Sequence, residues 1–220
     1  MLFRSAYELR VAWDPDVVGA NGRPEPQVTR QLVNVNGRPP GKPPGADGCR
    51  DPKPVSPEAL SMLLPWHLAE SKFTMAGLAR VDDRAAMTID YVNIAPLAPE
   101  IEWTDDCVSV ELPGRSRGRI WIDVRTFEVL RVDDRLSGSF EFPVPPQYVR
   151  KSAASSMTIE RAESSIRYRK VAFDNPVETL LMPVSMDTLT VMRSGTMQRT
   201  RISQRFSNYR RFLTAARLIE

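Results

Sequence analysis

The residues of this sequence that could take part in acid–base chemistry are three pairs of neighbouring aspartates and one histidine. They are Asp82–Asp83, Asp105–Asp106, Asp133–Asp134 and His67. Two carboxylates can cleave a glycosidic bond when a fold holds them at a fixed separation across a cleft. Each pair, however, lies where we predict a turn, and Asp is favoured in turns because its side chain hydrogen-bonds the nearby backbone. A Ser-His-Asp arrangement would have His67 as its one candidate base, so the sequence predicts no catalytic residue and no enzyme.

The two cysteines, Cys49 and Cys107, bear on metal binding and on the cellular compartment. A zinc site built from Cys and His needs more ligands than two cysteines and one histidine, so we expect no metal and no cofactor. The cysteines are either two buried thiols or one disulfide. We predict the disulfide, because a lone Cys in a loop rich in proline and glycine would be an exposed thiol. This bond requires an oxidising compartment.

Arginines alternate along the last predicted strand, at Arg199, Arg201 and Arg205. A solvated strand face explains such a row, and an anionic partner such as a lipid head group is the alternative. Methionine is also frequent, and Met182, Met186 and Met192 are predicted to share one strand face. Methionine is flexible and polarizable and suits surfaces that accept variable apolar partners, although a core of methionine is the other interpretation.

The composition limits the class of protein. The chain has 220 residues, 42% of them hydrophobic, and 30 basic against 27 acidic side chains, which gives a net charge of +3. This near balance predicts no nucleic-acid partner. No apolar run approaches the roughly 18 residues of a membrane-spanning helix. The N-terminal residues lack the apolar core of a signal peptide, so the protein is either cytosolic or has a leader upstream of this sequence, and we favour the leader.

A β-hairpin at residues 118–134 organises the rest of the chain. Ile, Trp, Val and Phe fill both of its arms, residues 119–123 and 127–132, and these residues favour strands. Each arm carries apolar groups on both faces, which is typical of a central strand or of one that lines a cavity as well as a core. The turn is predicted near residues 124–126.

Alternating strands joined by short turns make up most of the remaining sequence. We predict them at residues 3–13, 27–35, 73–81, 86–92, 108–112, 157–173, 177–192 and 197–212, the 157–173 strand with a bulge near Glu163–Ser164. Residues 93–106 and 142–147 contain prolines and are predicted to be connections. The pattern predicts a mainly β fold, a strongly curved antiparallel sheet or half barrel with one short helix inserted. We expect a single domain over residues 1–220: N-terminal strands in 1–37, a Pro/Gly loop in 38–57, a helix in 58–70 and the main sheet in 72–213.

The predicted helix begins with Ser56-Pro57-Glu58, a capping serine followed by proline and an acid in the first turn. Leu60, Leu63 and Leu64 follow at helical spacing, and Pro65 limits the helix to about two turns. This segment either packs on the sheet as core or forms a lid whose apolar face covers a cavity. His67 beside it is expected to be a surface or capping group.

Three segments resemble the LolA-like family of outer-membrane lipoprotein carriers, and uncharacterised bacterial exported proteins of that type. These are Gly118-Arg119-Ile120-Trp121-Ile122-Asp123 with Val129-Leu130-Arg131, then Met182-Pro183, and Phe206-Ser207-Asn208-Tyr209-Arg210-Arg211-Phe212. The resemblance covers roughly residues 72–213. It implies an antiparallel half barrel whose concave apolar face is covered by helices and receives acyl chains, in a protein exported to the periplasm or envelope. The family's long N-terminal helix is missing here, and the loop with Cys49 is an addition.

These observations lead to an expected function. We expect a non-enzymatic envelope protein, periplasmic or envelope-associated, that binds an acyl chain or other amphiphile in a half-barrel groove. The alternative is a structural or interaction module of the envelope with a filled core and no ligand. A lipid or lipid-modified partner, or a protein partner in the envelope, would fit. The candidate groove residues are Leu60, Leu63, Leu64, Met75, Trp121, Leu130, Met182, Met186 and Phe206.

Overall fold

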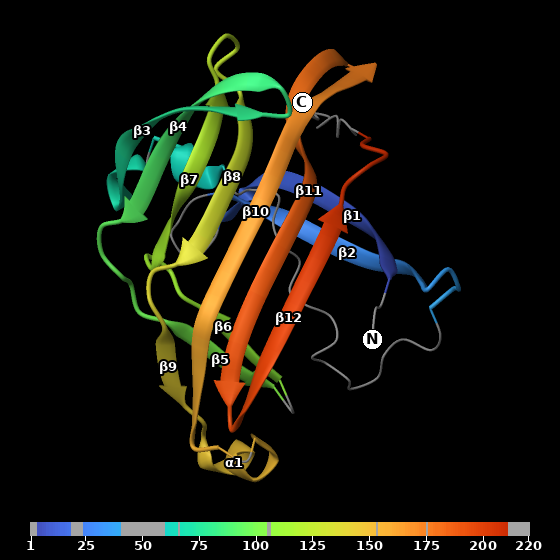
Figure 1. Cartoon of the computed structure of the whole chain (residues 1–220). Helices are drawn as coiled ribbons and strands as arrows, with labels where there is room; N and C mark the ends of the chain where they lie inside the picture. Colours follow the sequence, from blue (N-terminus) through green and yellow to red (C-terminus); the bar gives the residue numbers. More distant parts are fainter. Residues whose placement is uncertain are drawn as a thin grey trace. The chain divides into compact units, whose positions relative to one another are not determined.

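The computed structural model describes residues 4–18, 24–40, 60–65, 67–104, 107–152, 154–174 and 176–210. The chain divides into two compact units, one of Met1–Glu58 with Ile101–Val110 and one of Ala59–Glu100 with Glu111–Glu220. Antiparallel strands make up most of the described structure, together with one short α-helix, which confirms the mainly β prediction (Figure 1). No sheet of the described strands is strongly curled or closed, so the half barrel is not confirmed. That residues 1–220 fold as one domain stays a prediction.

The first unit contains a long antiparallel pair, β1 (Ser5–Val18) and β2 (Pro24–Val35). A tight turn follows β2, in which Asn36 and Gly37 have φ angles of 52° and 81°. Both residue types tolerate this left-handed region, and for this reason Asn-Gly in a sequence indicates a turn. The turn brings Arg38 back to pair with Val35 through two backbone hydrogen bonds.

A second short pair consists of β5 (Glu100–Thr104) and β6 (Cys107–Glu111). The predicted connection over residues 93–106 is therefore wrong from residue 100 onward. Ile101 and Trp103 alternate with Glu100 and Glu102, which is a strand pattern that the preceding prolines obscured. Cys107 begins β6, but Cys49 lies outside the described residues, as does most of the predicted Pro/Gly loop, so the predicted pairing of the two stays a prediction.

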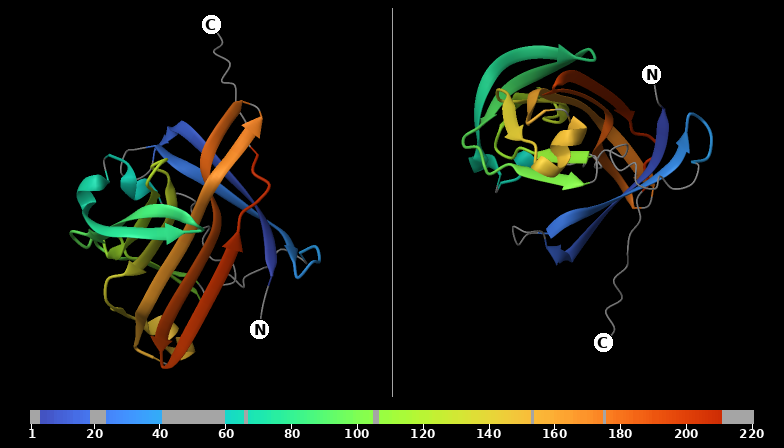
Figure 2. Two further views of the ribbon diagram at one scale, coloured as in Figure 1. Left: turned by 45° about the horizontal axis from the view of Figure 1, so that its top comes forward. Right: turned by 90° about the horizontal axis from the view of Figure 1, so that it is seen from below.

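The second unit is built on an eight-stranded antiparallel sheet with the order β12-β11-β10-β8-β7-β4-β3, in which β9 also pairs with β10. The strands are β3 (Ser71–Val81), β4 (Arg84–Asn93), β7 (Ser116–Asp123), β8 (Val129–Leu136), β9 (Phe140–Pro143), β10 (Ser156–Asp174), β11 (Val177–Ser194) and β12 (Thr196–Arg205). Figure 2 shows β10, β11 and β12 side by side along their length. The predicted hairpin at 118–134 is the β7–β8 hairpin at the middle of this sheet.

The β7–β8 turn is fixed by a buried carboxylate at the end of β7. Asp123 Oδ1 accepts hydrogen bonds from the backbone N–H groups of Arg125 (2.8 Å) and Thr126 (2.9 Å), and its Oδ2 accepts one from Arg84 Nε (2.8 Å). The Thr126 and Arg125 amides, with help from Arg84, lower the pKa of Asp123 to about 2. The carboxylate is therefore charged at all physiological pH values and holds two residues of the turn and the Arg84 side chain in place.

Two irregularities in β10 and β11 lie elsewhere than predicted. The register shifts between Ile159 and Arg161 and between Arg167 and Tyr168, and residues 163 and 164 pair regularly. At the second shift Arg167 pairs with Ser185 and Tyr168 with Pro183, so that one residue of β11 is left out of the ladder. An extra residue reverses the alternation beyond it, and the shared face predicted for the β11 methionines is therefore wrong for Met182.

The predicted helix over residues 58–70 is also wrong where the chain is described. Two single 3-10 turns occupy this stretch, η2 (Ser61–Leu63) and η3 (Leu68–Glu70). Pro65 separates them, because proline disfavours the helical conformation of the residue before it. The α-helix is α1 (Pro146–Ser152), which begins at a proline as many helices do, and β9 occupies the start of what was predicted to be a connection.

Candidate functional site

The register of the eight-stranded sheet aligns apolar side chains from six neighbouring strands in one row, which we name the apolar row. Its members are Met75, Ile89, Ile120, Val132, Ile166 and Met186, each paired with the next, and Gln204 of β12 ends it. Five inter-strand spacings of about 4.8 Å give the row a length of about 24 Å. We name the side of the sheet that carries it the apolar face, and the opposite side, which carries Arg119, the basic face.

The apolar row is buried in the middle and open at one end. Ile120 and Val132 are 1% and 2% exposed, whereas Met75 on the edge strand β3 is 60% exposed. Leu78, which pairs with Met87 in the neighbouring row of the same face, is 78% exposed. Large apolar side chains that water can reach at the edge of a buried apolar surface are typical of sites that receive an apolar partner.

A polar cluster interrupts the apolar face beside the apolar row. Tyr91, Gly118 and Asp134 are direct neighbours on β4, β7 and β8. Because Gly118 has no side chain, the Tyr91 ring lies across it and its hydroxyl donates to Asp134 Oδ1 at 2.5 Å. The Ser116 hydroxyl donates to the other carboxylate oxygen at 3.1 Å, so both oxygens of Asp134 have a donor.

Burial dominates the electrostatics of this cluster. Removal from water raises the pKa of the Asp134 carboxyl above its ordinary value, although the hydrogen bonds from Tyr91 and Ser116 oppose the shift. Burial, and then the nearby Asp134 charge, also raise the pKa of Tyr91. Tyr91 therefore stays a neutral hydrogen-bond donor at physiological pH.

Tyr168 places a second phenol on the apolar face. It follows Ile166 of the apolar row at strand spacing, is 6% exposed, and contributes to the raised pKa of Tyr91. Its buried hydroxyl has no hydrogen-bond partner among the described residues, and burial raises its pKa as well. A buried hydroxyl without a partner is costly, so its presence beside the apolar row is the strongest sign of a polar ligand atom at this place.

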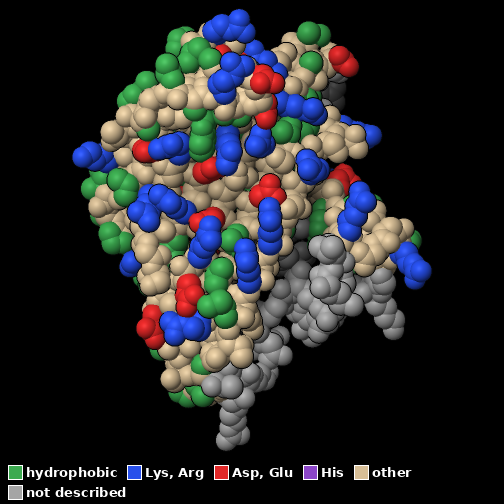
Figure 3. All heavy atoms as spheres, in the orientation of Figure 1, with side chains coloured by type: hydrophobic (Ala, Val, Ile, Leu, Met, Phe, Trp, Pro, Cys, Tyr) green, Lys and Arg blue, Asp and Glu red, His purple; other side chains and the backbone are tan. Residues whose placement is uncertain are grey.

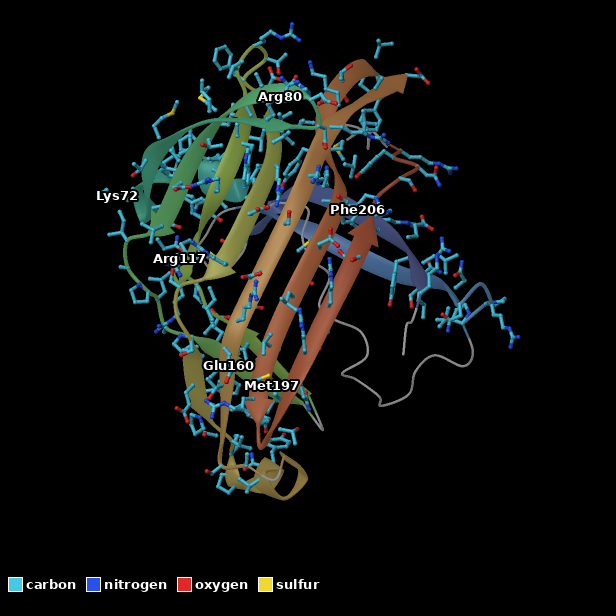
Figure 4. The ribbon with its side chains drawn as sticks, viewed as in Figure 1. Lys72, Arg80, Arg117, Glu160, Met197 and Phe206 are labelled. Carbon is cyan, nitrogen blue, oxygen red and sulfur yellow. The ribbon has the colours of Figure 1, made fainter. Side chains whose placement is uncertain are left out.

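The structure distributes the predicted groove residues over both faces of the sheet. Met75 and Met186 belong to the apolar row, and Phe206 continues the alternation of Ile202 and Gln204 on the same face. Figure 4 shows Phe206 at the end of β12. Trp121 and Leu130 instead pack with Val81 and Ala86 on the basic side, where Arg131 covers the Trp121 ring at 4.8 Å from its centroid.

The remaining predicted groove residues lie away from the apolar row. The bulge in β11 pairs Met182 with Arg169, which puts it on the basic face. Leu60, Leu63 and Leu64 lie in and around η2, and Leu64 is 36% exposed. Whether any of these residues contacts a ligand stays a prediction.

Of the acid pairs, Asp105–Asp106 lies outside the described residues, and the two described pairs do not assemble a catalytic centre. Asp82 and Asp83 form the predicted β3–β4 turn, with φ angles of 46° and 64°. The turn predicted at Asp133–Asp134 is wrong, because both residues lie inside β8 and point to opposite faces. His67 Nδ1 lies 2.9 Å from Glu70 Oε1. No group of three or more metal-ligating side chains occurs in the described part of the chain.

Sequence reasoning missed the polar cluster and Tyr168. Alternation along a strand assigns residues to faces, but only the pairing between strands shows that Tyr91, Gly118 and Asp134 form one line. A Gly inside a strand pattern was the available signal, because it often marks a place where another group approaches closely.

Comparison with known proteins adds no assignment to this site. No protein-family model, no curated protein and no solved structure matches the chain. No described helix is long and apolar enough to cross a membrane.

Proposed function

We propose that the protein binds an acyl chain or another amphiphile on the apolar face of the eight-stranded sheet and that it is not an enzyme. The observation that carries this proposal is the apolar row beside the Tyr168 hydroxyl, which is buried and has no partner among the described residues. The apolar row would contact the hydrocarbon chain, and the phenol would bond a polar atom of the ligand.

The energetics favour a long chain over a small ligand. Each methylene group removed from water contributes about 0.8 kcal/mol, and a row of about 24 Å can contact many of them at once. Met75 and Leu78 at the exposed β3 edge provide the point of entry. The ligand would then reach the buried middle of the row by displacing the side chains that cover Ile120 and Val132.

The polar groups restrict the ligand's head group. Asp134 already accepts hydrogen bonds at both oxygens, and its charge would repel a carboxylate or phosphate at close range. The Tyr168 hydroxyl can both donate and accept. We therefore expect it to bond an ester carbonyl, an amide or a hydroxyl, that is, the uncharged polar part of an amphiphile.

The proposal also covers the architecture of the eight-stranded sheet and the cellular location of the protein. In it, the eight-stranded sheet is a LolA-like half barrel around the ligand, and the protein works in the periplasm or envelope, where the Cys49–Cys107 disulfide could persist. The dominance of antiparallel strands supports this architecture, as does the apolar face. A structural or interaction module with a filled core is the alternative; one stoichiometric protein partner in a pull-down, with an empty lipid extract, would favour it.

Two measurements test the proposal. Organic extracts of the purified protein, analysed by mass spectrometry, should contain an amphiphile, and a fluorescent fatty-acid ester should bind saturably. Met75→Ser should weaken probe binding several-fold by shortening the row. Met197→Ser is the matched control, because Met197 is 65% exposed but lies at the start of β12 on the basic face (Figure 4). An empty extract together with no saturable binding of the probe would exclude ligand binding on this face.

A further inference from the structure

The basic face of the eight-stranded sheet carries a large surplus of positive charge. By the strand register it holds thirteen basic side chains, Lys72, Arg84, Arg117, Arg119, Arg131, Arg135, Arg161, Arg167, Arg169, Arg193, Arg199, Arg201 and Arg205. It holds eight acidic ones, Asp90, Asp123, Asp133, Glu141, Glu160, Glu163, Glu178 and Asp187. The surplus is 13 − 8 = 5 positive charges, more than the +3 of the whole chain. Figure 3 shows these side chains gathered over β8, β10, β11 and β12.

Seven of the basic side chains have no carboxylate partner among the described residues. Six arginines of this face form ion pairs, for example Arg119 with Asp90 and Arg193 with Glu160. The unpaired ones are Lys72, Arg117, Arg135, Arg169, Arg199, Arg201 and Arg205. All seven are exposed, and Lys72 and Arg117 lie on the β3 side of the sheet in Figure 4.

The strand pairing places like charges directly opposite one another. Arg117 pairs with Arg135, and neither has a carboxylate partner among the described residues; Arg131 pairs with Arg167, but these two have the partners Asp133 and Asp82. Directly opposed like charges destabilise a sheet, and a solvated face needs no such arrangement. An anionic partner would turn the Arg117–Arg135 pair into part of a binding surface, because guanidinium groups bond phosphate oxygens in a bidentate way.

Exposed apolar side chains lie at one end of the same sheet. The β7–β8 turn and the β10–β11 hairpin lie at this end, because β8 and β10 run antiparallel. Phe127 in the first turn is 71% exposed, and Val177 and Leu180 in the hairpin are 90% and 38% exposed. Figure 1 shows both turns at the top of the molecule. Arg125 is exposed and lies two residues before Phe127 in the sequence. Arg169 is also exposed and lies on β10, the strand paired with the β11 strand that carries Leu180.

We propose that the basic face, with the apolar turn residues at its border, docks on a membrane surface rich in anionic phospholipids. Basic residues that bind head groups beside apolar residues that enter the interface are the two parts of a peripheral membrane site. Nucleic acid fits less well, since single strands need aromatic rings for base stacking, and the Trp121 ring on this face is covered by Arg131. The proposal is independent of ligand binding on the opposite, apolar face.

Vesicle sedimentation with the full chain tests this docking. The protein should bind phosphatidylcholine vesicles that contain phosphatidylglycerol, and added salt should weaken the binding. Each basic side chain near an anionic surface contributes about a factor of five, so Arg199→Gln/Arg201→Gln/Arg205→Gln should bind on the order of a hundred-fold more weakly. Arg10→Gln/Arg38→Gln/Arg80→Gln, with the same net charge and no change among the residues of the basic face, should bind far better than this variant.

A second variant separates lipid from other anionic partners. Phe127→Ser/Val177→Ser keeps every charge and should also lose vesicle binding, while leaving any weak binding to a short DNA duplex unchanged. Equal binding to vesicles with and without phosphatidylglycerol would overturn the proposal. So would equal losses in the two triple variants, or DNA binding that is tighter than vesicle binding.

Discussion

At the scale of single residues, the two buried tyrosines of the apolar face differ in one respect that mutation can measure. The Tyr91 hydroxyl donates to the Asp134 carboxylate, whereas the Tyr168 hydroxyl has no partner among the described residues. Tyr91→Phe should lower the free energy of unfolding by about 1.5–3 kcal/mol, because it removes a hydrogen bond to a buried charge. Tyr168→Phe should be neutral or stabilise by about 1 kcal/mol, since it removes a buried hydroxyl that costs free energy.

Urea unfolding of the two variants checks this prediction, and each serves as the control for the other. Equal losses of stability would show that the two hydroxyl groups have equivalent surroundings. If Tyr168→Phe also weakens binding of the fatty-acid ester, the loss of affinity cannot come from a loss of stability, which ties this hydroxyl to the ligand.

Asp134 predicts a pH dependence of stability. Burial holds its folded-state pKa above the unfolded value of about 3.9. Between those two values the native state binds more protons than the unfolded chain, so stability falls as pH rises through this window and then stays lower. Asp134→Asn removes the titration. The free energy of unfolding of the variant relative to the natural protein should therefore rise from about pH 4 upward and then level off. Parallel pH profiles of the two proteins, measured by urea unfolding, would contradict this.

At the scale of elements, Gly118 lets β4, β7 and β8 form the polar cluster. A Cβ atom there would lie 2.0 Å from the Asp133 carbonyl oxygen and 2.7 Å from the Tyr91 hydroxyl. Gly118→Ala should therefore destabilise by about 1–3 kcal/mol through overpacking. It should also displace the Tyr91 ring from Asp134.

A double-mutant cycle tests whether this glycine acts through the hydrogen bond. Tyr91→Phe should cost much less stability in the Gly118→Ala background than in the natural protein, because the bond is already lost. Additive effects would show that the glycine and the tyrosine stabilise the sheet independently.

The strands could be predicted from the sequence where alternation and turn residues agree. β3, β4, β7, β8, β10, β11 and β12 all appear where alternating apolar residues meet turns such as Asp82–Asp83 or Ser194–Gly195. Several of the failures lie where proline enters the pattern. Ser56-Pro57-Glu58, the predicted start of a helix, lies outside the described residues, and 3-10 turns on either side of Pro65 stand where the rest of that helix was predicted. Because prolines 143, 145 and 146 are closely spaced, a connection was predicted there, and neither β9 nor α1 was expected.

The candidate site could be predicted only in part, for a different physical reason. Met75 and Met186 were expected in a groove, and pairing puts both in the apolar row. Trp121 was expected there as well, yet it follows Ile120 on β7 and therefore lies on the other face of the sheet. One bulged position in β11 puts Met182 on the face opposite to that of Met186. Local patterns fix which residues alternate, but bulges and cross-strand register decide which residues of distant strands meet.

At the scale of the whole molecule, the eight-stranded sheet separates two kinds of chemistry. One face buries the apolar row and a cluster of polar groups, and the other exposes seven unpaired basic side chains of the described chain. A sheet that is apolar on one face and charged on the other is the ordinary antiparallel pattern. The surplus of one charge sign and the like-charge cross-strand pairs exceed what that pattern needs, and therefore the two faces can serve different partners.

The last prediction concerns Cys49 and Cys107, of which Cys49 lies outside the described residues. If they are joined, the bond closes a loop of 107 − 49 = 58 positions, for which chain entropy gives a stabilisation of about 4 kcal/mol. This is comparable to the whole stability of many domains. Reduction of the protein, or Cys49→Ser/Cys107→Ser, should therefore lower the unfolding midpoint strongly, and reducing agent should have no further effect on the double variant. Mass spectrometry of peptides cleaved without reduction checks the bond directly, and free thiols at both positions after folding under oxidising conditions would remove the support for an oxidising compartment as well.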